Sequence, residues 1–187
     1  RISSDSATAR VLANAFVMSG TLGVGEATHN GTLSLSGNVT LGAATTLTVA
    51  SAAVISGVVG GAYSLTKAGS AELTLSGANT FSGPTNVDAG VLTLSGGSAL
   101  VNSMAATVGA GGTLKLASSE EIASLAGAGA VNLQGSVLSL SGGVDTSFSG
   151  VMSGAGSLVK TGAGVFTMSG ANTFSGGLDL SAGAIEV

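Results

Sequence analysis

The chain has 187 residues, of which only 7% are charged and 3% aromatic, whereas glycine occurs 32 times and proline once. High hydrophobicity with low charge excludes intrinsic disorder, and glycine without a three-residue period excludes a collagen helix. A net charge of −4 with five scattered basic residues excludes a nucleic-acid surface, and the lack of cysteine excludes disulfides, thiolate metal sites and thiol catalysis.

Short segments of alternating apolar and polar residues recur along the chain. Leu, Val, Phe or Met falls on every second position, with Ser, Thr or Lys between. Period two is the pattern of a β-strand with one buried face, and most segments close on glycine, which supplies the turn. The predicted strands, in chain order, are 32–36, 46–49, 73–76, 91–95, 113–116, 137–141 and 165–168.

The best helix candidate is the segment 118–125, because two serines precede two glutamates. Ile122 and Leu125 lie three residues apart, as on a helix face. The segment soon reaches Gly127-Ala-Gly129, however, and glycines end a helix. We therefore predict a corner and a short strand here, and no helix of note elsewhere.

The octapeptide Ser-Gly-Ala-Asn-Thr-Phe-Ser-Gly occurs twice, at 76–83 and at 169–176. The offset is 93 residues, and an ungapped alignment of 56–94 with 149–187 gives 20 identities in 39 positions. Duplication of a glycine-rich, apolar segment indicates an architecture of stacked units rather than a ligand site. The chain is thus predicted to be a single repetitive segment, 1–187.

These patterns predict an all-β fold, a right-handed parallel β-helix (solenoid) of roughly 8–9 coils, with roughly 20–23 residues per coil. The right hand is expected from general chirality rules. The offset of 93 residues would then be about four coils, and the two octapeptides would occupy related corners. Asn79 and Asn172 are predicted to form side-chain ladders along the stack, and Phe81 and Phe174 to fill the core at equivalent levels.

Candidate catalytic groups are few. His29 is the only histidine and lies in a polar corner three residues from Glu26, so a structural or exposed role is expected. Glu120 and Glu121 are the only adjacent acids, and on a strand they would point to opposite faces. Lys67 and Lys160 hold equivalent repeat positions beside glycine corners and are expected to be solvated. We therefore predict no catalytic, cofactor-binding or metal-binding residues and no cofactor.

The segments 61–69, 73–83 and 87–92, repeated at 154–162, 169–176 and 182–183, resemble the passenger-associated transport repeat of bacterial autotransporters. The opening segment, 9–14, is similar to the stretch that often precedes this repeat. The resemblance implies a β-helical passenger at the bacterial surface or outside the cell, with any membrane β-barrel outside this chain. The start of the chain does not have the pattern of a signal peptide, so we expect that a leader was removed or that the chain is internal to a longer protein.

Three functions remain open. The first is a structural stalk or scaffold segment of an adhesin, with no catalysis. The second is a self-assembling extracellular fibre, in which copies stack end to end. The third is a carbohydrate-active β-helix, whose acids, Glu26, Glu72, Asp88 and Glu120, would meet in space. The expected partners are the rest of the same polypeptide or neighbouring copies, together with host or surface glycans and proteins, and no nucleic acid.

Overall fold

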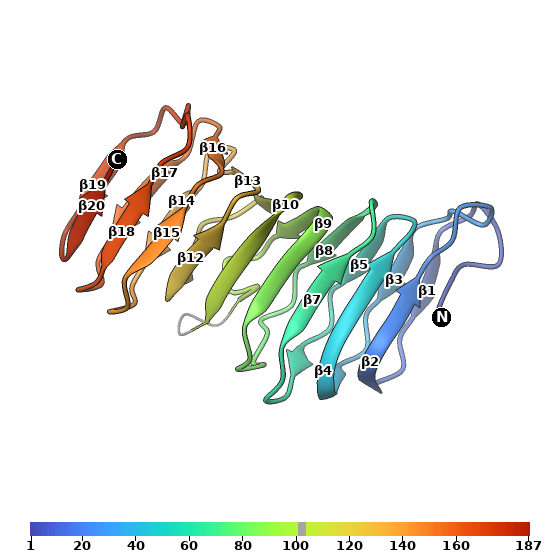
Figure 1. Ribbon diagram of the computed structural model, residues 1–187. Coiled ribbons are helices and arrows are strands. Elements are labelled where there is room, and N and C mark those ends of the chain that lie inside the picture. The colour runs from blue at the N-terminus through green and yellow to red at the C-terminus, as the bar shows by residue number, and fades with distance from the viewer. Residues whose placement is uncertain (101–103) are drawn as a thin grey trace.

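The computed structural model describes residues 1–100 and 104–187, which form a parallel β-solenoid of about nine turns. Every strand pairing among these residues is parallel, and they contain no helix. The coils stack along one axis, with the two termini at opposite ends of the stack (Figure 1). The prediction of a parallel β-helix with roughly 8–9 coils is therefore confirmed.

Each coil passes three faces in turn. The first face holds β1(Arg10–Leu12), β3(Leu33–Leu35), β5(Ala53–Ile55), β8(Glu72–Leu75), the ends of β9(Thr85–Leu94) and β10(Ala105–Leu116), β13(Ala130–Asn132) and β16(Val151–Ser153). The second holds the starts of β2(Phe16–Val24) and β4(Val39–Val49), then β6(Val59–Gly60), β11(Glu120–Ile122), β14(Val137–Leu140), β17(Ser157–Lys160) and β19(Leu178–Leu180). The third holds the ends of β2 and β4, then β7(Leu65–Ala68), the starts of β9 and β10, β12(Ser124–Gly127), β15(Thr146–Phe148), β18(Val165–Met168) and β20(Ala184–Glu186).

The strand register sets the length of a coil. On the first face Leu33 pairs with Ala53 and Ala53 pairs with Leu73, so each of these coils takes 20 residues. The later step from Leu92 to Leu114 takes 22 residues. Because side chains alternate along a strand, this register places apolar residues above one another inside the coil.

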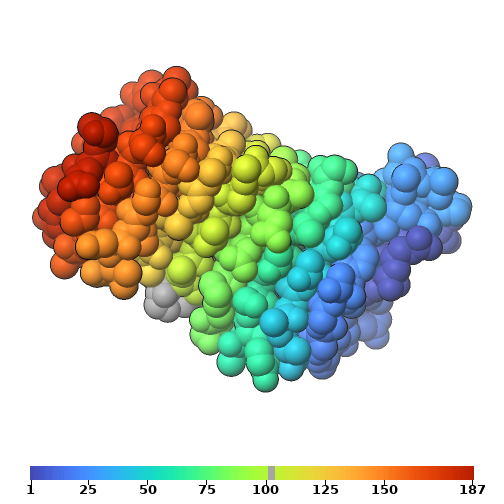
Figure 2. Space-filling model, viewed as in Figure 1, coloured from blue at the N-terminus to red at the C-terminus, as the bar shows by residue number. Residues whose placement is uncertain are grey.

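The core is a continuous column of these inward side chains. On the first face it contains leucines at successive levels, such as Leu75, Leu94 and Leu116, all at most 1% exposed. Phe81, Phe148 and Phe166 are fully buried in the same column. The coils pack side by side without a break along the stack (Figure 2). Burial of this column is the main stabilising contribution, at roughly 25 cal/mol per Å² of apolar surface.

All seven predicted strand segments coincide with observed strands. The segment 118–125 forms β11 and the start of β12, with a corner between them, as predicted. Phe81 fills the core, whereas Phe174 is only partly buried, because it lies in the last coil. The core prediction is thus confirmed at Phe81, whereas Phe174 only packs against the core, so the two phenylalanines do not fill equivalent levels.

The expectation that the two octapeptides occupy related corners was wrong. Lys67 of the first copy lies in β7 on the third face, whereas its counterpart Lys160 lies in β17 on the second face. The ladder from β7 through β9, β10 and β12 to β15 covers four turns, and β17 follows after two more faces. The copies are therefore separated by about four and two-thirds turns, not four.

This rotation is possible because the local contacts of the repeat do not depend on which face carries them. Gly61 and Gly154 both have positive φ, at 117° and 103°. Asn79 accepts a hydrogen bond from the amide of Val59 at 2.8 Å, and Asn172 accepts the equivalent bond from Met152 at 2.8 Å. The repeat thus encodes a strand and its corners, and more than one face of the solenoid accommodates it.

Candidate functional site

A pocket lies at the corner between the first and second faces. It has a volume of about 280 Å³ and is lined by Gly97, Ser98, Ser119, Glu120, Glu121 and Ser139. Gly97 and Ser98 follow β9, the two glutamates belong to β11, and Ser139 belongs to β14. The serine and glutamate side chains that line the pocket carry only oxygen atoms as polar groups. The pocket therefore suits water or another hydrogen-bonding ligand.

Glu120 is the unusual residue of this pocket, because its side chain points inward. The paired position in the next coil, on β14, is the apolar residue Leu138. Glu120 is 3% exposed, and its Oε1 accepts a hydrogen bond from the amide of Leu100 at 2.7 Å. Its Oε2 is buried without a partner among the described residues. Burial raises the pKa of Glu120, while the backbone amides of Leu100 and Ala99 oppose that rise.

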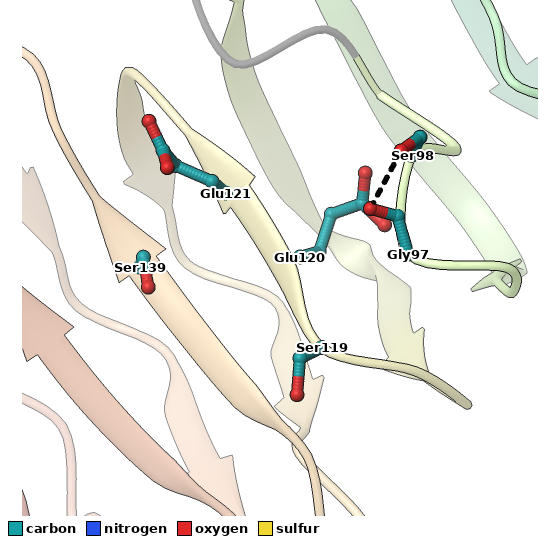
Figure 3. A pocket seen from close by; sticks show the side chains of 6 residues that line it. All are labelled: Gly97, Ser98, Ser119, Glu120, Glu121 and Ser139. Carbon is teal, nitrogen blue, oxygen red and sulfur yellow. Dashed lines mark hydrogen bonds between the residues drawn. The ribbon is translucent and has the colours of Figure 1, made fainter.

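Glu121 does not join Glu120 in a catalytic pair. The two side chains leave β11 on opposite sides, and Glu120 extends toward Gly97 while Glu121 points away from it (Figure 3). This arrangement confirms the prediction of opposite faces. A glycosidase needs two carboxyl groups that face one substrate, and this strand does not provide them.

The other acids that we considered serve separate local contacts. The Oε1 of Glu72 accepts a hydrogen bond from the hydroxyl of Thr93 at 2.5 Å, one coil away. Glu26 lies near the N-terminus, where it contacts Arg1 at 2.9 Å. Asp88 follows the third-face part of β9 and is exposed. The described residues contain no group of three or more His, Cys, Asp or Glu placed to hold a metal ion.

His29 is half-exposed and pairs with Glu26, with its Nδ1 2.9 Å from Oε1. The hydrogen bond from His29 and the nearby Arg1 charge lower the pKa of Glu26, against an opposing effect of burial. The Oγ of Ser3 contacts Glu26 rather than the imidazole. Ser3 is therefore not activated by this histidine, and His29 lies in a polar corner, as expected from the sequence.

The prediction that Lys67 and Lys160 are solvated was wrong. Lys67 is 0% exposed and Lys160 is 3% exposed. The Nζ of Lys67 donates to the carbonyl oxygens of Ala68, Gly69 and Ala89, at 3.0, 2.8 and 2.9 Å, and the Nζ of Lys160 donates to the carbonyl of Gly162. Burial lowers the pKa of Lys67 to about 8, so the side chain stays protonated at neutral pH.

Asn79 and Asn172 hydrogen-bond along the stack, but to backbone groups of adjacent coils, so the predicted ladder of asparagine side chains is not what the structure contains. Asn79 is 6% exposed, and besides its bond to Val59 it donates from Nδ2 to the carbonyl of Ala99 at 2.7 Å. It thereby connects the coil before it with the coil after it. Glu120 uses the same geometry when it accepts from Leu100, 20 residues earlier. Polar side chains inside the solenoid therefore satisfy backbone groups where the strands are interrupted at corners.

The described residues form strands and corners only, so they provide no membrane-spanning helix. No solved structure matches the chain at a significant level. Residues 65–99 and 158–187 match the family described as passenger-associated-transport-repeat. These two segments contain both buried lysines and both octapeptides.

The chain is also similar to the adhesin BmaC autotransporter of Brucella suis biovar 1 (strain 1330), with 39% identity over 167 residues. The match covers 88% of this chain but only 5% of that relative. The repeat match and the named relative both point to autotransporter proteins, and the parallel coils are consistent with the repeat. The chain is a parallel β-solenoid that carries two segments matching the passenger-associated-transport-repeat family, and it is similar to part of an autotransporter adhesin.

Proposed function

We propose that this chain is a structural scaffold segment of a larger, surface-displayed adhesin, and that it carries no catalysis. The observation that carries the proposal is the use of its buried polar side chains. Lys67 and Asn79 bind backbone atoms of a neighbouring coil, as does the Oε1 atom of Glu120. Groups already occupied in holding coils together are not free to act on a substrate.

The relative supports the setting of the proposal. Its name describes an adhesin autotransporter, and the chain spans about 5% of its length. A passenger of that kind is displayed at the bacterial surface or outside the cell. Repeated coils give such a protein length with little sequence complexity, because each coil contacts only its neighbours. Adhesion to host glycans or proteins is proposed for the whole protein rather than for these coils.

A self-assembling fibre is a second candidate, favoured by the last strand of the second face. Leu178 and Leu180 of β19 are 47% and 50% exposed. Their partners in the β17 register, Leu158 and Lys160, are 0% and 3% exposed. A coil laid over β19, from the same polypeptide or from a neighbouring copy, would bury these leucines. Sedimentation velocity over a wide range of concentration separates the two sources, since only assembly of copies makes the mass depend on concentration.

Limited proteolysis tests the scaffold. Trypsin cleaves after Lys and Arg, and the five such residues include the exposed Arg10 but also the buried Lys67 and Lys160. We expect native trypsin digestion to trim the N-terminal residues and to leave a fragment that begins at Val11 and extends beyond Lys160. Rapid cleavage at Lys67 would contradict a stable scaffold.

Activity assays test the absence of catalysis. The wild-type chain should release no reducing sugar from a panel of bacterial and host polysaccharides. Sugar release that disappears in Glu120→Gln would overturn the proposal in favour of the carbohydrate-active alternative. Glu121→Gln serves as the matched control, because Glu121 lies on the same strand but on its opposite side.

A further inference from the structure

Both copies of the repeat carry the same short element, Leu-x-Lys-x-Gly, at 65–69 and at 158–162. In each copy the leucine and the lysine point inward from one strand, and the glycine forms the corner after it. The lysine therefore ends inside the solenoid at the point where the chain turns. An ammonium group in such a place needs hydrogen-bond acceptors, because an unpaired buried charge is very unfavourable.

At Lys67 the acceptors match the donors in number. An ammonium group has three N–H donors, and three carbonyl oxygens lie within 3.0 Å of Nζ. Two of the carbonyls belong to Ala68 and Gly69 at the corner of the same coil. The third belongs to Ala89, 22 residues later, at the corner of the following coil. One side chain thus binds two successive corners.

We propose that the Leu-x-Lys-x-Gly element is a lysine clamp, which holds the glycine corner of its own coil and, at Lys67, also locks that corner to the corner of the next coil. The clamp does not require a particular face, since it is built on the third face at Lys67 and on the second face at Lys160. This role goes beyond the proposed scaffold function. It gives the repeat a defined physical role, which is to hold a glycine corner and, in the first copy, to fix the relative position of two adjacent turns.

The glycine of the second corner fits this role. Gly90 has a φ of 69°, and a Cβ atom added there would lie 2.9 Å from Nζ of Lys67 and 2.4 Å from the carbonyl oxygen of Gly69. A side chain at this position would displace the ammonium from its acceptors. Gly183 is the counterpart of Gly90 in the second copy and has a φ of 74°. Both copies therefore keep a glycine at the corresponding corner of the next coil, although among the described residues only Lys67 makes a contact there.

The two clamps differ in completeness, which provides an internal control. Among the contacts of the described residues, the Nζ of Lys160 binds the carbonyl of Gly162 in its own coil and no carbonyl of the following coil. The Lys67 clamp thus couples two coils, whereas the Lys160 clamp holds one corner. Loss of the first should affect both corners, and loss of the second should remain local.

The test compares Lys67→Met with Lys160→Met by amide hydrogen exchange on the folded chain. In Lys67→Met we expect exchange to accelerate at least about tenfold at both corners, 68–71 and 89–91, with a lower Tm. In Lys160→Met the acceleration should be confined to 161–163. Unchanged exchange at 89–91 in Lys67→Met would overturn the proposal, because a lysine that merely fills space has no reason to affect the next coil.

A measurement on the wild-type chain covers the case in which Lys67→Met does not fold. With ¹⁵N-labelled lysine at mildly acidic pH, the Lys67 ammonium should give a slowly exchanging NH₃⁺ signal, because its protons are buried and hydrogen-bonded. The half-buried Lys115 provides the reference for faster exchange with water. A spectrum in which neither Lys67 nor Lys160 exchanges more slowly than Lys115 would contradict the clamp.

Discussion

The Nζ atom of Lys67 lies 2.9 Å from the carbonyl oxygen of Ala89, which belongs to the next coil of the solenoid. This contact joins residues that are 22 positions apart in the chain but adjacent in the stack. It shows how a protein with very few charged residues uses one of them. The charge is directed at the backbone, where coils meet, rather than at solvent or at a ligand.

The pKa of Lys67 makes stability depend on alkaline pH. Burial lowers this pKa from 10.5 to about 8, so between these pH values the unfolded chain holds a proton that the folded chain has released. The free energy of unfolding therefore rises as pH increases through this window, by about 3 kcal/mol at most. Urea denaturation of the wild type and of Lys67→Met at the two ends of the window measures the effect as a difference, in which the other titrating groups cancel. A difference that stays constant would contradict it.

Glu120 gives the opposite dependence at acidic pH. Burial raises its pKa above 4.5, so just above pH 4.5 the folded chain holds a proton that the unfolded chain has lost. The free energy of unfolding contributed by Glu120 therefore falls as pH rises through that window. Glu120→Gln keeps the acceptor for Leu100 and carries no charge, so it should be more stable than the wild type at neutral pH and lose this advantage in acid. An equal advantage at both pH values would be the contrary result.

Asn79 and Asn172 form a matched pair for side-chain bridging. Asn79 is buried and binds both the amide of Val59 and the carbonyl of Ala99, whereas Asn172 is less buried and binds the amide of Met152. Removing a partner from a buried polar group costs about 1–3 kcal/mol. We expect Asn79→Ala to lower the free energy of unfolding by about 3 kcal/mol and Asn172→Ala by about 1 kcal/mol. Equal losses in chemical denaturation would show that the second bond of Asn79 contributes nothing.

Glycine at position 90 is required by two independent constraints. Its φ of 69° is unfavourable for other residues, and an added Cβ would lie 2.4 Å from the carbonyl oxygen of Gly69. Gly90→Ala should therefore lower the free energy of unfolding by about 3 kcal/mol. Gly143→Ala is the control, because an added Cβ there meets no atom within 4 Å. Thermal denaturation of the two variants should separate them clearly, and similar Tm values would contradict the close approach at Gly90.

The strands could be predicted from the sequence because alternation survives in almost every coil. The same alternation also indicates that Lys67 is buried, because residues two positions apart on a strand point to the same side. Lys67 lies two residues after the inward Leu65, in phase with the core. Glu120 is in phase with the buried Ile122 in the same way. Lys67 was nevertheless expected to be solvated, because charged side chains are usually exposed. The glycine corner makes burial possible, because its carbonyl groups accept hydrogen bonds from the ammonium group.

The positions of the two repeat copies could not be predicted, for a geometric reason. Coils of 20 and 22 residues both occur, and the difference lies in the corners, where side chains carry little periodic signal. An offset of 93 residues is therefore compatible with several rotations about the axis. The pocket at Glu120 was missed for a similar cause, since its lining comes from three segments whose lateral register the sequence does not specify.

Distances along one face test the parallel solenoid most directly. Thr46, Thr66, Asn86 and Thr167 belong to one register on the third face, and the chain has no cysteine, so pairs of spin labels can be placed cleanly. With the second label fixed at Thr167, labels at positions 46, 66 and 86 lie six, five and four coils away. Double electron–electron resonance should give about 29, 24 and 19 Å, in even steps of about 4.8 Å per coil. Distances that do not decrease in equal steps would contradict the stacked, parallel arrangement.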